Sequence, residues 1–269
     1  MHVHFLDPYR PRRSPVHRLD ARVKLLLVVA FILSCALTPN GAWPVYLLLL
    51  AVALATALLS ELGIGFVLKR AALALPFVLA ALPLVFTAPG EHLLDIPLGR
   101  LIISISAPGL ERFISIALKS WISVQAAIIL ASSTPFPDLL AAMRAVRIPR
   151  LLVAIFGLMW RYLFVLVDEV LRLTRARAAR SGHSDRTDVH PGGNWTWRAR
   201  ITGGMAGNLF MRALERSDRI YMAMVSRGYD GEVRSTPLPI LSTIHWAILS
   251  AGLVFLFFLL LFCNQYWVL

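Results

Sequence analysis

Residues 43–60 read WPVYLLLLAVALATALLS and include no charged side chain. Roughly 17 to 25 predominantly apolar residues are enough for a helix to cross the hydrocarbon core of a bilayer. The chain has further windows of this kind at about 23–38, 68–88, 113–133 and 239–263. We therefore predict an all-α polytopic membrane protein with about five transmembrane helices.

The composition of the whole chain supports a location in the lipid bilayer. Hydrophobic residues make up 58% of the 269 residues, and the mean hydropathy is +0.69. In a soluble protein the net charge of +12 would suit a nucleic-acid binder. Here the basic residues lie between apolar spans, where the positive-inside rule predicts cytoplasmic loops. We expect no nucleic-acid partner.

The positions of lysine and arginine predict the orientation of the chain. The arm 1–22 is basic, and basic residues recur at 69–70 and 144–150, so these segments are expected in the cytoplasm. The loop 39–42 carries no charge, and the loop 89–112 balances both signs, as external loops can. The sequence therefore predicts a multi-pass protein of a prokaryotic inner membrane, with a cytoplasmic N-terminus and an external C-terminus.

The apolar segment Leu151–Val167 is not counted as a span. It contains Arg161, and if it crossed, the arginines between 172 and 234 would lie outside, against the same rule. We predict a helix on the cytoplasmic side that is buried against protein. The predicted parts of the chain are a cytoplasmic arm (1–22), a four-helix transmembrane region (23–133) with an external loop (89–112), a cytoplasmic coupling-helix region (134–236) and a final transmembrane helix (237–269).

Two smaller features lie toward the predicted outer face. His92–Pro97 and Leu101–Ile105 alternate weakly between apolar and polar residues around Gly99-Arg100, which predicts a small hairpin. Lys119 lies near the outer end of the fourth span. We interpret it as a lysine whose amine reaches the membrane surface rather than as a functional charge.

Two arginine-glycine helix ends occur in the polar region, which we predict to hold three cytoplasmic or interfacial helices at about 138–147, 150–180 and 205–227. The ends read Ala179-Arg180-Ser181-Gly182 and Val225-Ser226-Arg227-Gly228. Helix capping alone explains each end, because the helix dipole favours a cation there and glycine adopts the left-handed conformation. Arginine can also grip a carboxylate with two hydrogen bonds. Repetition favours two matched contact points for a partner with two equivalent halves.

The chain resembles the transmembrane T components of energy-coupling factor (ECF) transporters, especially their cobalt/nickel type. The resemblance covers nearly the whole chain. It rests on four segments: Ser14–Lys24, Thr134–Pro137, Arg161–Glu169 and Arg216–Tyr229.

The resemblance implies a scaffold that couples two ABC-type ATPase subunits to a substrate-binding membrane S component, here for cobalt or nickel uptake. Each motif arginine would sit in a groove of one ATPase, and the helix over 150–167 would carry the movement to the S component. The implied ATPase-coupling residues are Ala179, Arg180, Ser181, Ser226, Arg227 and Gly228. The family's first motif commonly reads Ala-Arg-Gly, whereas this chain has Ser181 before the glycine.

We expect this chain to be non-catalytic and to bind no cofactor. It contains no Gly-x-x-x-x-Gly-Lys-Ser/Thr loop, so ATP and Mg²⁺ are expected in the partner ATPases. Cys35 and Cys263 lie far apart in apolar runs and are interpreted as packing residues. His2 and His4 have the chemistry of metal ligands but lie on the predicted cytoplasmic arm, so no metal site is predicted.

Three alternatives stay open. The chain could be a T component for a vitamin or another micronutrient, because in the resembling family another subunit selects the substrate. A stand-alone secondary carrier would need broken helices near the midplane, and Pro76 and Pro83 could bend the third span. A membrane enzyme would need converging polar groups, and the spans supply little beyond Lys119, His245 and scattered serines.

Overall fold

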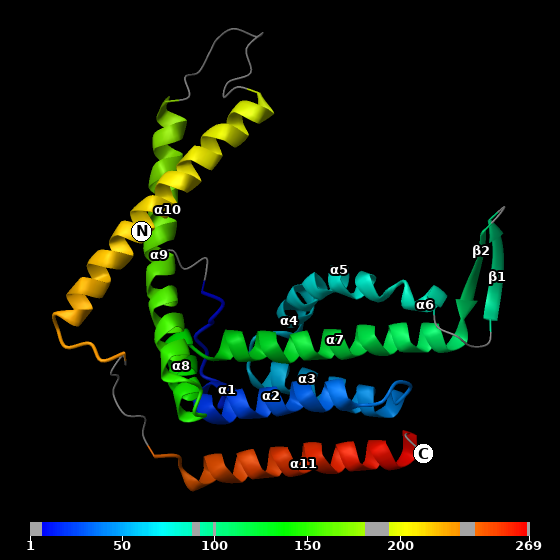
Figure 1. Ribbon diagram of the computed structural model, residues 1–269. Helices are drawn as coiled ribbons and strands as arrows, with labels where there is room; N and C mark the ends of the chain where they lie inside the picture. Colours follow the sequence, from blue (N-terminus) through cyan, green and yellow to red (C-terminus); the bar gives the residue numbers. More distant parts are fainter. Residues whose placement is uncertain (1–6, 88–91, 99–100, 181–193, 232–239, 268–269) are drawn as a thin grey trace. The chain divides into compact units, whose positions relative to one another are not determined.

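The computed structural model describes residues 7–87, 92–98, 101–180, 194–231 and 240–267 (Figure 1). The chain divides into two compact units. We call Pro8–Val146 with Leu238–Leu269 the bundle unit, and Met1–Asp7 with Arg147–Pro237 the paired-helix unit. The boundary between the two units falls inside the predicted coupling-helix region 134–236, because the first helix of that region belongs to the bundle unit.

The bundle unit is built almost entirely from helices (Figure 1). Its elements are α1 (Pro15–Arg18), α2 (Ala21–Leu37), α3 (Trp43–Leu59), α4 (Ile64–Ala71), η1 (Ala72–Ala74), α5 (Leu75–Val78), η2 (Leu79–Ala81), α6 (Leu84–Thr87), β1 (His92–Leu98), β2 (Leu101–Ser106), α7 (Ala107–Ser133), α8 (Phe136–Ala145) and α11 (Thr243–Trp267). The all-α polytopic class is confirmed.

Within the part of the chain that the structure describes, three helices are long and apolar enough to cross a membrane: α7, α11 and α9 (Arg150–Arg180). A fourth span results if the bent pair Ile64–Ala74 and Leu79–Phe86 is taken as one. The helix α3 is apolar but only 17 residues long. The helix α9 is long and apolar enough to be a membrane span. The placement of 151–167 on the cytoplasmic side therefore stays a prediction.

The third predicted span is not one continuous helix. The window 68–88 was predicted as a single crossing, but the structure has short helical pieces with a bend of 42° between Ile64–Ala74 and Leu79–Phe86. Pro76 and Pro83 lie in this stretch. Proline lacks the N–H that the helix ladder needs, and its ring clashes with the carbonyl four residues before it. The prolines that were expected to bend the third span therefore lie where the helix is interrupted.

The core of the bundle unit lies between α2, α3, α7 and α11. Its buried side chains include Phe31, Tyr46, Leu49, Ile122 and Leu256. Both cysteines, Cys35 and Cys263, are fully buried in the same cluster, as predicted for packing residues.

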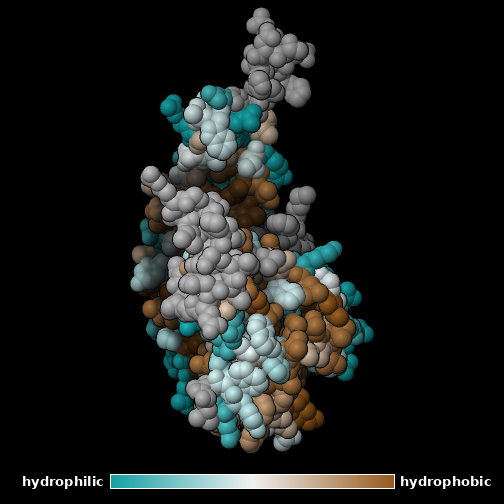
Figure 2. All heavy atoms as spheres, turned by 90° about the vertical axis from the view of Figure 1, so that its right-hand side faces the viewer, coloured by the Kyte–Doolittle hydropathy of each residue, from teal (hydrophilic) through white to brown (hydrophobic). Residues whose placement is uncertain are grey.

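Much of the outer surface is also apolar. Figure 2 shows broad hydrophobic areas on the face that it presents. On α11, Phe257 and Phe258 are 60% and 63% exposed. Large apolar side chains exposed on a helix of this hydropathy suit a lipid environment.

The predicted hairpin is confirmed. Strands β1 and β2 pair antiparallel, and Leu98 lies opposite Leu101 at the last pair before the turn. The amine of Lys119 donates to the side-chain oxygen of Asn40 over 3.2 Å, and Asn40 belongs to the loop predicted to be external. Lys119 therefore contacts this loop, and its interpretation as a lysine that reaches the membrane surface stays a prediction.

The N-terminal arm holds the end of α7. The backbone N–H of Arg10 donates to the carbonyl of Ser132 over 2.9 Å, and the amine of Lys24 donates to the carbonyl of Ser133 over 3.0 Å. The last four carbonyls of a helix lack partners within it. The arm, through Arg10, and α2, through Lys24, therefore satisfy one carbonyl each and fix the point from which α8 continues.

Candidate functional site

The paired-helix unit contains two long helices, α9 (Arg150–Arg180) and α10 (Trp195–Val225). The helix α10 begins ten residues before the start predicted at about 205. Asn194 caps it, with its side-chain oxygen accepting from the N–H of Trp195 over 2.7 Å. Gly203 and Gly204 lie inside the helix. A glycine in a helix interior costs about 1 kcal/mol relative to alanine. The helix nevertheless continues through both of them.

Two polar contacts join α9 to α10. Arg212 donates to Glu169 over 2.8 Å, and Arg177 donates to the hydroxyl of Thr202 over 3.0 Å. The later residue on α9 meets the earlier residue on α10, so the helices run antiparallel, and Figure 1 shows them crossing.

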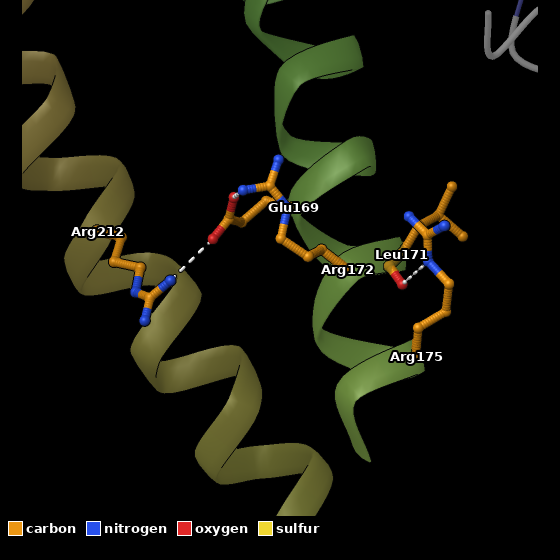
Figure 3. Close-up of polar contacts among 5 residues, drawn as sticks. All are labelled: Glu169, Leu171, Arg172, Arg175 and Arg212. Carbon is orange, nitrogen blue, oxygen red and sulfur yellow. Dashed lines mark hydrogen bonds and ion pairs between the residues drawn. The ribbon is translucent and has the colours of Figure 1, made fainter. Parts of the chain in front are cut away.

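Glu169 is the centre of a small charge cluster (Figure 3). Its side chain is only 16% exposed and also lies 3.9 Å from Arg172 on its own helix. Residues three positions apart are neighbours on a helix surface, which accounts for the Arg172 contact. The sequence did not predict Arg212, because nothing in the pattern says which residues meet across a connection of 43 positions.

The end of α10 is a complete glycine cap. Gly228 has φ +78°, its N–H donates to the carbonyl of Val225 over 2.9 Å, and the N–H of Tyr229 donates to the carbonyl of Met224 over 3.0 Å. These are the two bonds of the Schellman motif. Arg227 is the residue just before the left-handed glycine, and it is exposed. Ser226, also exposed, donates its hydroxyl to the carbonyl of Ala223.

The end of α9 carries the other predicted arginine. Ala179 and Arg180 are the last two helical residues, and both are exposed. Ser181 and Gly182 lie outside the described residues. Within the described ranges, neither Arg180 nor Arg227 has a side-chain hydrogen bond or ion pair, whereas Arg177 and Arg212 are both engaged.

The two arginine tips lie at opposite ends of the helix pair. Because α9 and α10 are antiparallel, their C-terminal ends point in opposite directions. Arg180 lies less than one turn beyond the contact of Arg177 with Thr202. From Thr202 to Arg227, α10 runs for about 38 Å at 1.5 Å per residue. The tips are thus two separate cationic points on one pair of helices.

The described residues contain no group of three or more His, Cys, Asp or Glu side chains that could hold a metal ion. His2 and His4 lie outside the described residues.

These features define a class: a helical membrane protein that carries a polar, antiparallel helix pair with an exposed arginine at each end. The chain belongs to the CbiQ cobalt transport protein family, whose profile matches residues 12–238. It is therefore a transmembrane component of a cobalt transport or ECF transporter system.

The chain is also similar to individual proteins that are named for cobalt transport or for an energy-coupling factor transporter. The cobalt transport protein CbiQ of Rhodobacter capsulatus is 30% identical over 184 residues, covering 65% of this chain and 72% of that protein. The transmembrane protein EcfT of an energy-coupling factor transporter from Listeria innocua is 27% identical over 236 residues, covering 84% of each. A putative fused cobalt transport protein CbiMQ of Methanocorpusculum labreanum is 28% identical over 258 residues, covering 93% of this chain and 40% of that protein.

Proposed function

We propose that this chain is the T component of an ATP-driven ECF importer and that it couples two ABC-type ATPase subunits to an S component that binds the substrate. The observation that carries the proposal is the pair of exposed arginines, Arg180 and Arg227, without side-chain partners in the described ranges at opposite ends of one helix pair. The paired-helix unit then lies in the cytoplasm, as the basic residues predict.

The separation of the tips favours two partner subunits. At a distance of roughly 40 Å along the pair, the two arginines do not fit one pocket. Each guanidinium has the fork geometry that pairs with a carboxylate, and each stands at the C-terminal end of a helix. One carboxylate-lined groove on each of two equivalent ATPases matches this arrangement. ATP and Mg²⁺ are then bound by those subunits.

The contacts between α9 and α10 support transmission of movement. Glu169 and Arg212 join the helices in their middle parts, so a displacement of one tip is passed to the other helix. The first half of α9 offers exposed apolar residues, including Leu151, Ile155 and Met159, which suit contact with the S component. Coupling requires that these contacts differ between two states.

Cobalt or nickel is the proposed substrate, because the family and the Rhodobacter capsulatus relative are named for cobalt transport. The similarity to EcfT over 84% of each chain favours another micronutrient, such as a vitamin, as the second candidate.

The test is reconstitution. The tagged chain is expressed with the ATPase subunits and a cobalt-binding S component, purified in detergent and placed in proteoliposomes. We expect the four-part complex to co-purify and to take up cobalt only with ATP, while the chain alone moves none. Cobalt uptake by the chain alone would instead identify a secondary carrier.

A further inference from the structure

Two adjoining hollows in the bundle unit differ sharply in polarity. The first is an apolar cavity of about 230 Å³ between α2, α3, α7 and α11. Its lining includes Phe31, Ala53, Ala126, Gly252 and Leu256. Among the described residues of that lining, Lys24 alone is charged, and its amine already donates to the carbonyl of Ser133. The cavity therefore offers space for hydrocarbon.

The second hollow is basic. Its volume is about 360 Å³, and it lies between α1 and the beginning of α11. Arg13, Arg18 and His245 supply its polar groups, and none of the described residues that line it carries a carboxylate. Within the described ranges, the side chains of Arg13 and Arg18 have no hydrogen bond or ion pair. The acid closest in sequence, Asp20, is paired with Arg22 at 3.6 Å. Among the described residues, no acidic side chain therefore neutralises these two arginines.

The two hollows adjoin each other, since Leu19 lines both of them. On α11, His245 lines the basic hollow, and Gly252 and Leu256 line the apolar one. Residues 7 and 11 positions apart lie on the same face of a helix, and the first interval corresponds to about 10 Å along the axis. A charged group and a hydrocarbon chain are therefore accommodated in line, along one side of α11.

We propose that these two hollows form a binding site for one anionic phospholipid. The headgroup phosphate binds Arg13 and Arg18, with His245 beside it, and one acyl chain enters the cavity between α2 and α11. Arginine matches phosphate with two parallel hydrogen bonds, and basic residues next to a membrane span attract anionic lipids. The site goes beyond the proposed ATPase coupling and does not depend on it.

Charge and shape together select this occupant. A divalent metal ion is repelled by the two arginines, and a soluble anion leaves the apolar cavity unused. A zwitterionic phospholipid has the acyl chain but carries a compensating cation in its headgroup. An anionic phospholipid satisfies both hollows at once.

The test is native mass spectrometry of the full chain released from detergent after titration with phosphatidylglycerol, or with phosphatidylcholine of the same acyl chains. We expect one phosphatidylglycerol per chain, bound more tightly than phosphatidylcholine. The variant Arg13→Gln/Arg18→Gln should bind phosphatidylglycerol about tenfold more weakly. Arg12→Gln/Arg200→Gln removes the same charge from two exposed arginines outside the hollows, and it should bind like the wild type.

A second variant tests the apolar half. Ala126→Phe fills the cavity and should weaken retention of phosphatidylglycerol while leaving binding of inorganic phosphate unchanged. Thermal unfolding confirms that each variant is folded. Equal affinity for the two lipids, or wild-type retention by Arg13→Gln/Arg18→Gln, would overturn the proposal. So would competition by inorganic phosphate as strong as that by the intact lipid.

Discussion

Arg212 of α10 donates a hydrogen bond to Glu169 of α9 over 2.8 Å, and the two side chains form a direct ion pair between the long helices (Figure 3). Glu169 is 16% exposed and Arg212 is 63% exposed. The pair is therefore half-shielded, and it stands where the antiparallel helices meet.

Breaking this pair should loosen the two helices. In a double-mutant cycle of Glu169→Gln and Arg212→Gln, we expect a coupling free energy of about 0.5–1 kcal/mol, since partial exposure screens the charges. The cycle is measured by thermal unfolding of the purified chain. Glu215→Gln with Arg219→Gln is the control, because that pair is exposed and 4.0 Å apart. A coupling at Glu169 no larger than the control value contradicts a structural role for the contact.

Two glycines of the same region should respond in opposite directions to alanine. Gly228 has φ +78°, so Gly228→Ala forces a side chain into the left-handed conformation and should destabilise the cap by about 1 kcal/mol. Gly207 lies inside α10, and a methyl group added to its Cα would meet no atom within 4 Å. Gly207→Ala should therefore stabilise the helix by about 0.5–1 kcal/mol. Melting temperatures of the two variants test these two predictions. An unchanged or higher melting temperature for Gly228→Ala would show that the cap is not under this constraint, and a lower one for Gly207→Ala would contradict the expected gain in helix stability.

The side chain of Gln125 should be a source of instability. It is fully buried in α7, and its two amide atoms have no hydrogen-bond partner within the described part of the chain. Leaving buried polar atoms unpaired costs about 1–3 kcal/mol. Gln125→Met keeps the length of the side chain and should raise the melting temperature.

The control for Gln125 is Ser115→Ala. Ser115 is also buried in α7, but its hydroxyl accepts from the N–H of Gly41 over 3.2 Å, so its loss should lower the melting temperature. A lower melting temperature for Gln125→Met than for the wild type would show that the buried amide stabilises the fold, contrary to this prediction.

His17 should make the attachment of the N-terminal arm sensitive to pH. Its Nε2 contacts the carbonyl of Arg10 at 3.0 Å, and its Nδ1 contacts the hydroxyl of Ser14 at 2.7 Å. Burial lowers the pKa of His17 from its ordinary value of 6.5. The hydrogen bond with the carbonyl of Arg10 raises the pKa, and the charge of Lys24 lowers it. Glu61 raises this pKa and Arg12 lowers it, both by smaller amounts.

The sign follows from proton binding. Because the pKa of His17 is lower in the folded chain, the unfolded chain binds more protons in the interval between the two pKa values, and stability rises with pH. The contribution is complete above about pH 6.5 and is lost as the pH falls through the lower, folded-state pKa. Melting temperatures between pH 8 and pH 5 should fall more steeply for the wild type than for His17→Gln. Parallel curves would exclude this histidine as the cause.

The apolar windows of the sequence predicted most of the helices, because a charge-free run of this length has few alternatives to a membrane helix. Windows 23–38, 43–60, 113–133 and 239–263 correspond to α2, α3, α7 and α11. The window 68–88 failed as a single helix, since average hydropathy does not register what Pro76 does to a backbone.

The site was predicted in part. The glycine cap at Gly228 follows local rules and could be read from four residues. The ion pair of Glu169 with Arg212 could not, because a contact between helices depends on their crossing geometry rather than on spacing along either one. The basic hollow was missed for the same reason: Arg18 and His245 lie at opposite ends of the sequence.

Arg180 and Arg227 are the two proposed docking points for ATPase subunits. The most direct test is a pull-down of the ATPase subunits by the wild-type chain, by Arg180→Glu, by Arg227→Glu and by the double variant. The matched control is Arg200→Glu/Arg219→Glu, two exposed arginines within α10, and all variants are checked for folding in detergent. We predict that each single reversal weakens binding, by at least about tenfold, that the double variant retains no ATPase, and that the control binds like the wild type. Wild-type binding by the folded double variant would contradict the docking role and reduce both arginines to helix caps.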